Sequence, residues 1–110
     1  PVATNTVLAD LTQISTGGGY TAGAGGGLAL DTVTLSETTG TAKVTIADEV
    51  FTASGASVGP LRYVDIYNDT ASSPADALVC WYDYGSSITL ADTETFTLDF
   101  DATNGLWQLA

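Results

Sequence analysis

The sequence predicts an all-β protein, a single antiparallel β-sandwich of about seven short strands behind an extended, glycine-rich N-terminal arm. Residues 60–110 hold apolar, aromatic-rich runs separated by Asn, Asp, Ser, Pro and Gly, which is the pattern of a β meander. Apolar and polar residues alternate at 42–46 and 96–100, as in strands with one buried face. No segment shows an apolar stripe at helical spacing. A small barrel is the alternative architecture.

The predicted strands follow one another along the chain after the glycine-rich stretch. An irregularity is expected near Asp31–Thr32, and polar loops are expected at 54–60 and 68–76. Pro60 should end any ladder that reaches it, because proline has no backbone N–H to donate. The strands are expected at residues 28–35, 42–46, 50–53, 61–67, 78–84, 93–100 and 106–109.

The strongest strand patterns predict the core and the last turn. Both faces of residues 78–84 are apolar or aromatic, so this strand is expected to be central and covered on both sides. Phe96, Leu98 and Val64 are expected to point inward. Asn104–Gly105 is expected to turn a hairpin between the last two strands, since Asn-Gly accepts positive φ at low cost.

Residues 1–27 differ in composition from the domain expected at 28–110. Seven glycines lie among residues 17–27, too many for a stable helix or strand interior. We therefore expect an extended N-terminal arm and linker; a disordered tail is the alternative. Scattered aliphatic residues favour an arm that orders against a neighbouring subunit. Its expected interaction residues are Val2, Val7, Leu8, Leu11, Ile14 and the aromatic anchor Tyr20.

Charge restricts the partners. Two basic residues, Lys43 and Arg62, stand against 13 acidic ones, a net charge of −11. Nucleic acid and anionic membranes are poor partners, because both are bound through Lys and Arg. The acidic balance indicates either solubility by self-repulsion or steering toward a basic partner surface. No apolar run approaches the length of a membrane span, and no secretory signal is visible. The leading proline suggests a removed initiator methionine and synthesis in the cytoplasm.

The residues that carry catalysis are scarce, so we expect no enzyme and no cofactor. The chain has no His and one cysteine, Cys80, which is expected to be a buried free thiol. Asp99 and Asp101 flank Phe100 and would share one strand face, the only arrangement for acid–base chemistry. The same turn gives weak metal candidates, Asp99, Asp101 and Asn104, in an incomplete calcium-loop pattern. A plain Asn-Gly hairpin is the preferred interpretation.

Aromatic side chains concentrate in the strongest predicted strands. Most are expected in the core. The alternative is that one face contacts protein or sugar, since Tyr and Trp are enriched at binding surfaces. The group consists of Tyr63, Tyr67, Trp81, Tyr82, Tyr84 and Trp107.

Four segments carry a family resemblance across most of the chain. They are LTQISTGGGYTAG at 11–23, RYVDIYND at 62–69, WYDYGSSITL at 81–90 and FTLDFDATNGLWQLA at 96–110. Together they resemble a largely uncharacterised family of small virion structural proteins of tailed bacteriophages. GAGGG stands where the family pattern has a shorter glycine turn, so the resemblance does not define the path of the linker. No catalytic residue is implied.

The resemblance implies a virion structural component. We expect a capsid decoration, or cement, protein that binds the outer surface of the head and stabilises the shell. Its partner would be the phage major capsid protein, with homo-oligomerisation, a location on the capsid surface and synthesis in the host cytoplasm. The alternative is a receptor- or glycan-binding module of a phage tail or head fibre.

Overall fold

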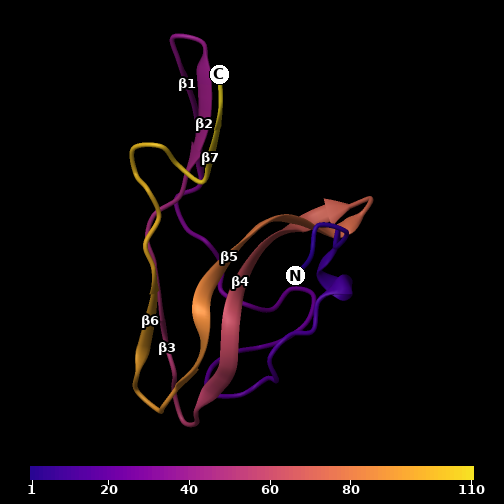
Figure 1. Ribbon diagram of the computed structural model, residues 1–110, viewed down its shortest axis with the longest axis vertical. Helices are drawn as coiled ribbons and strands as arrows, with labels where there is room; N and C mark the ends of the chain where they lie inside the picture. The colour runs from indigo at the N-terminus through magenta and orange to yellow at the C-terminus, as the bar shows by residue number, and fades with distance from the viewer. The chain divides into compact units, whose positions relative to one another are not determined.

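The computed structural model describes residues 1–110 and is built mostly of strands, with one short 3₁₀ helix. The all-β class expected from the sequence is confirmed. Figure 1 shows the elements along the chain. They are η1 (Leu8–Asp10), β1 (Thr34–Thr38), β2 (Thr41–Thr45), β3 (Glu49–Thr52), β4 (Val58–Ser72), β5 (Ala75–Leu90), β6 (Thr95–Leu98) and β7 (Trp107–Leu109).

The seven strands form three separate sheets, ordered β1-β2-β7, β3-β6 and β4-β5. The prediction that the last strands form a meander, each paired with the next, is therefore wrong. β6 pairs with β3, and β7 pairs with β2. The turn at Asn104–Gly105 leads into β7 without closing a hairpin. Leu106 N–H donates to the carbonyl of Val44 at 2.7 Å, which starts the β2–β7 pairing. These pairings do not confirm a single sandwich of seven strands.

The β4–β5 hairpin is longer than the sequence predicts. The expected loop at 68–76 is mostly strand, with Ser72 opposite Ala75 at its tip. Pro60 lies inside β4, where the register shifts between Val58 and Leu61. The prediction that Pro60 ends the ladder is therefore wrong, because a bulge accommodates a residue that cannot donate.

Contacts divide the chain into two compact units. Unit 1 comprises residues 1–27 and 52–94, and unit 2 comprises residues 28–51 and 95–110. One division falls between residues 27 and 28, where the sequence places a boundary, but residues 52–94, with β4 and β5, group with the N-terminal residues. The first strand also begins later than predicted, at Thr34, after the irregularity at Thr32, whose φ is +52°.

The N-terminal segment packs within unit 1. Val7 bridges Ala77, and Leu78 N–H donates to the carbonyl of Thr6 at 2.9 Å. Figure 1 shows the indigo N-terminal residues beside the tip of the β4–β5 hairpin. Leu8 is buried. The rest of this unit's small core is Ala53, Val58, Ile66 and Leu90.

Gly18 is required where the glycine-rich segment meets the chain before β4. Its φ is +58°, and an added Cβ would lie 2.7 Å from the carbonyl oxygen of Ala56 and against Val58. Its own carbonyl accepts the N–H of Ser54 at 2.9 Å. Any side chain here would break this contact or strain the backbone.

Unit 2 has fewer buried side chains than unit 1. Ile46 and Phe100 are its buried apolar residues, and Phe100 N–H donates to Asp48 Oδ1 at 2.8 Å. The expected core residues Phe96 and Leu98 are only half-buried, as is Val64 in unit 1. None of the helices is both long and apolar enough to cross a bilayer.

Candidate functional site

An exposed aromatic patch lies on the β4–β5 hairpin. Tyr63 is opposite Asp83 and Asp65 is opposite Trp81, so all four project from one face of this antiparallel pair. The rings of Tyr63 and Trp81 meet edge to face, with centroids 5.8 Å apart and planes at 80°. Tyr63 is 39% exposed and Trp81 is 45% exposed. We call Arg62, Tyr63, Trp81 and Asp83 the aromatic patch.

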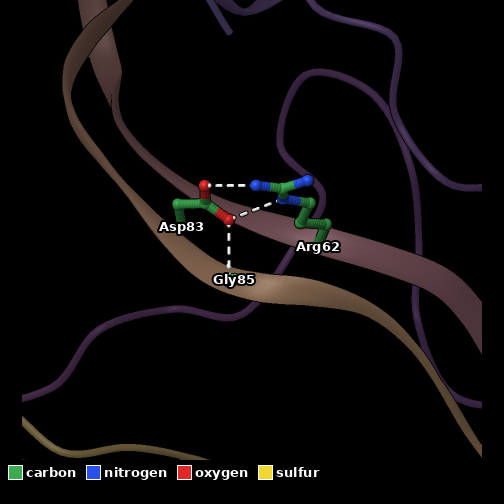
Figure 2. A network of polar contacts seen from close by, with 3 residues as sticks. All are labelled: Arg62, Asp83 and Gly85. Carbon is green, nitrogen blue, oxygen red and sulfur yellow. Dashed lines mark hydrogen bonds and ion pairs between the residues drawn. The ribbon is translucent and has the colours of Figure 1, made fainter.

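Arg62 and Asp83 form a two-pronged ion pair at this patch. Arg62 Nε donates to Asp83 Oδ1 at 2.7 Å, and Nη2 donates to Oδ2 at 2.8 Å. Gly85 N–H also donates to Asp83 Oδ1 at 2.8 Å (Figure 2). The Arg62 hydrogen bond and then the Gly85 N–H lower the pKa of Asp83 to about 2. The same pairing raises the pKa of Arg62, which stays charged.

The guanidinium also contacts the aromatic side of the patch. Arg62 Cζ lies 5.3 Å from the centroid of the Tyr63 ring, within the range of a cation–π contact. The ion pair and the rings therefore contact one another on an exposed surface. The patch presents π faces beside donors and acceptors of fixed direction, which suits contact with a planar or ring-shaped partner group.

The other end of the same face is covered by the glycine-rich segment. Tyr67 donates its hydroxyl to the carbonyl of Gly26 at 2.8 Å, and Asp69 Oδ1 accepts the N–H of Gly25 at 3.0 Å. Asp65 Oδ1 is buried without a hydrogen-bond partner, and burial raises the pKa of Asp65. Burial also raises the pKa of Tyr20, with Tyr67 and Asp65 adding to it.

A second exposed surface lies on the β1–β2–β7 sheet of unit 2. Leu35, Val44 and Trp107 form one row across the three strands, because each is the register partner of the next. The neighbouring row places Leu109 next to Ala42. Leu35 is 71% exposed, Leu109 68% and Trp107 46%. We call Leu35, Ala42, Val44, Trp107 and Leu109 the apolar sheet face.

The expected interaction residues of the arm lie mostly against their own unit. Leu8 is buried, and Val2 is 60% exposed. Tyr20 donates its hydroxyl to Gln13 Oε1 at 3.3 Å. The half-buried residues of the set are Val7, Leu11, Ile14 and Tyr20. Within one chain only Leu8 is buried, and the others keep part of their surface exposed, so their contact with another subunit stays a prediction.

The acidic turn after β6 has a structural explanation. Asp101 Oδ1 accepts the N–H groups of Thr103 and Asn104 at 2.8 and 2.9 Å, and Oδ2 accepts Asn104 Nδ2 at 2.6 Å. The Asn104 backbone and side chain, and then the Thr103 backbone, lower the pKa of Asp101. Asp99 and Asp101 do not share a strand face, because β6 ends at Leu98. No group of three or more potential metal-binding residues is found in the chain.

Cys80 is a free thiol, half-buried on β5 beside the register partner Ile66. Burial raises its pKa, and a hydrogen bond with Tyr82 opposes that rise. A thiol with a raised pKa is a poor nucleophile at neutral pH, so Cys80 acts as a small apolar side chain.

Sequence reasoning missed the Arg62–Asp83 pair and the apolar sheet face. The pair joins positions 21 residues apart, and only the hairpin register brings them together. A tight turn at Ser73–Pro74 would have been the signal, because a hairpin centred there places Arg62 near Asp83. The sheet face had no local signal, since β7 follows β2 by about 60 residues.

The comparisons add no relative to this geometry. A scan against protein-family models, a search of curated proteins and a search of solved structures all found no match.

Proposed function

We propose that this chain is a bacteriophage capsid decoration protein, which binds the outer surface of the head and stabilises the shell. The observation that carries the proposal is the exposure of large apolar and aromatic side chains on ordered strands of both units. Contiguous exposed apolar surface marks protein contacts in small soluble domains. The sequence resemblance to phage virion proteins supplies the context.

The charge distribution favours a basic partner, because the chain itself is strongly acidic. Both basic side chains are already engaged, Arg62 with Asp83 and Lys43 with the carbonyl of Thr103 at 2.8 Å. The remaining carboxylates repel other free copies before assembly. Cations that neutralise them would come from the major capsid protein. Self-association, which the sequence predicts, would have to overcome this repulsion.

Decoration would stabilise the shell by mass action. A protein that binds the assembled shell and not its free subunits favours the assembled state by its binding free energy. No catalytic group is needed for this activity. That the seven strands form a single sandwich when the protein is bound to the head also remains a prediction.

Quantitative mass spectrometry of purified virions tests the proposal. We expect a copy number comparable with that of the repeating units of the head, and heads that lose thermal stability when the gene is deleted. Adding the purified chain back should restore that stability. A handful of copies per virion, or unchanged stability after deletion, would contradict the proposal.

The aromatic patch favours a second candidate, a glycan-binding module of a tail or head fibre. Exposed Tyr63 and Trp81 rings beside the polar pair of Arg62 and Asp83 suit stacking on a sugar ring. A glycan array probed with the wild type and Trp81→Ala tests this function. Saturable binding that Trp81→Ala abolishes would support it, and a chelator arm would show whether calcium takes part. Trp107→Ala in unit 2 is the matched control.

A further inference from the structure

We infer that the apolar sheet face is a docking site for a basic protein surface, an apolar groove rimmed by Lys or Arg side chains. The face belongs to a sheet with two different sides. Leu35, Val44 and Trp107 share one side, whereas Ser36, Lys43 and Gln108 form a register row on the other. A sheet with one apolar and one polar side normally buries the apolar side.

The large side chains on the two outer strands of the apolar side are exposed, whereas Ala42 and Val44 on the middle strand are half-buried. Leu35 and Leu109 are among the chain's most exposed large apolar residues. β1 and β7 are both edge strands of this sheet, so their outer backbone groups have no strand partner. A partner could therefore use the face and an edge of the sheet together.

The charge of unit 2 indicates which kind of partner fits the apolar sheet face. Unit 2 carries six carboxylate side chains and one lysine. Glu37 lies in the same register row as Ala42 and Leu109, on the apolar side. Lys43 lies on the opposite side and donates to Thr103. A second copy would add further carboxylates and no cation to this face. A basic partner would supply the positive charges that this face lacks.

The size of the face indicates how firmly it binds. β1 and β2 extend roughly 17 Å and the three-residue β7 about 10 Å, and the three strands span about 10 Å across their axes. Such a face is smaller than the ~800 Å² per partner of a standard stable interface. Firm attachment would therefore need several sites on one particle or further contacts from the same chain. The outer surface of a phage head repeats its sites in this way; naming that surface as the partner rests on the proposed function.

The test uses the full chain and two short synthetic peptides of alternating sequence, one of Leu and Lys and one of Leu and Glu. Binding is followed by amide and indole shifts in NMR. The test variant is Leu35→Ser with Leu109→Ser, both exposed, so the fold should be retained. Gln108→Ser, on the polar side of β7, is the matched control. Circular dichroism checks folding of each variant.

We expect the Leu/Lys peptide to shift residues of the apolar sheet face and the Leu/Glu peptide to bind at least about tenfold more weakly. The double variant should weaken Leu/Lys binding by at least about tenfold, since two apolar contacts are removed. Gln108→Ser should bind like the wild type. Glu37→Gln should reduce the salt dependence of binding. Equal binding by the double variant, or equal affinity for both peptides, would overturn the inference.

Two further measurements separate this inference from the proposed function. If sedimentation shows a wild-type dimer that the double variant loses, a second copy occupies the face and the inference is overturned. The second measurement is binding to heads made without this protein. If the wild type and the double variant bind these heads equally, the inferred docking face is wrong, whereas the proposed decoration function still holds. If no variant binds heads but the peptide discrimination holds, decoration fails and the docking face stands.

Discussion

Replacing Leu8 by alanine tests whether the N-terminal segment is part of unit 1. Leu8 is 7% exposed and belongs to a core of five apolar side chains in that unit. Buried Leu→Ala substitutions cost about 2–5 kcal/mol, depending on how far the site collapses. Leu8 lies in a three-residue 3₁₀ helix, which we expect to shift more easily than a long strand and so to close part of the cavity. We therefore expect a loss of about 2–3 kcal/mol in the free energy of unfolding.

Urea denaturation gives the measurement. Trp81 lies in unit 1 and Trp107 in unit 2, so a Trp107→Phe background makes tryptophan fluorescence report on unit 1 alone. With a urea slope of about 1 kcal/mol per molar for a small unit, the midpoint should fall by roughly 2–3 M. Val2→Ala is the control, because Val2 is 60% exposed and its substitution should change stability by less than about 0.5 kcal/mol.

An unchanged midpoint for Leu8→Ala would refute this reasoning. Residues 1–27 would then behave as the extended arm that the sequence predicts, and their apolar side chains would be available to another subunit. Deletion of residues 1–16 should agree with the point variant, lowering the midpoint at least as far.

Three further predictions concern single groups. The pKa of Asp83 is lowered from 3.8 to about 2, so its ion pair with Arg62 should stabilise the fold above pH 4 and lose this effect as the pH falls toward 2. In pH-dependent melting, Asp83→Asn should therefore show a smaller change of stability with pH over that range than the wild type. Gly18→Ala should destabilise unit 1 by more than about 1 kcal/mol, and by more than Gly23→Ala, whose added Cβ meets nothing, in the same urea assay. The raised pKa of Cys80 should make its reaction with a thiol reagent slower than that of free cysteine at pH 7, with a rate that rises into the alkaline range; a faster reaction would contradict its burial.

Local patterns predicted local structure well. The alternation at 42–46 corresponds to β2, and the run expected at 50–53 corresponds to β3. An irregularity is expected near Asp31–Thr32, and Thr32 has a positive φ. These features depend on side-chain alternation and on backbone preferences within a few residues.

Strand length in the β4–β5 hairpin was underestimated for a physical reason. Asn68, Asp69 and Thr70 resemble a loop by composition, but the end of a two-stranded ribbon tolerates polar side chains, and Asp69 accepts the N–H of Gly25 there. Asn68 Oδ1 accepts the N–H of Thr70 at 3.0 Å, so the polar side chains satisfy backbone groups within the extended chain. Polar composition alone therefore did not distinguish a loop from the end of a hairpin.

The sequence by itself determined that this protein is built of strands, strongly acidic and without histidine chemistry, because these properties follow from composition and from a repeat of two residues. Only the tertiary structure decided that β7 pairs with β2 and β6 with β3. It also decided that Arg62 forms an ion pair with Asp83 and that Leu8 is buried within unit 1. Alternation specifies which side of a strand is apolar but not which partner covers it. The hydrophobic effect has no direction, so the partner is chosen by contacts between residues far apart in the chain.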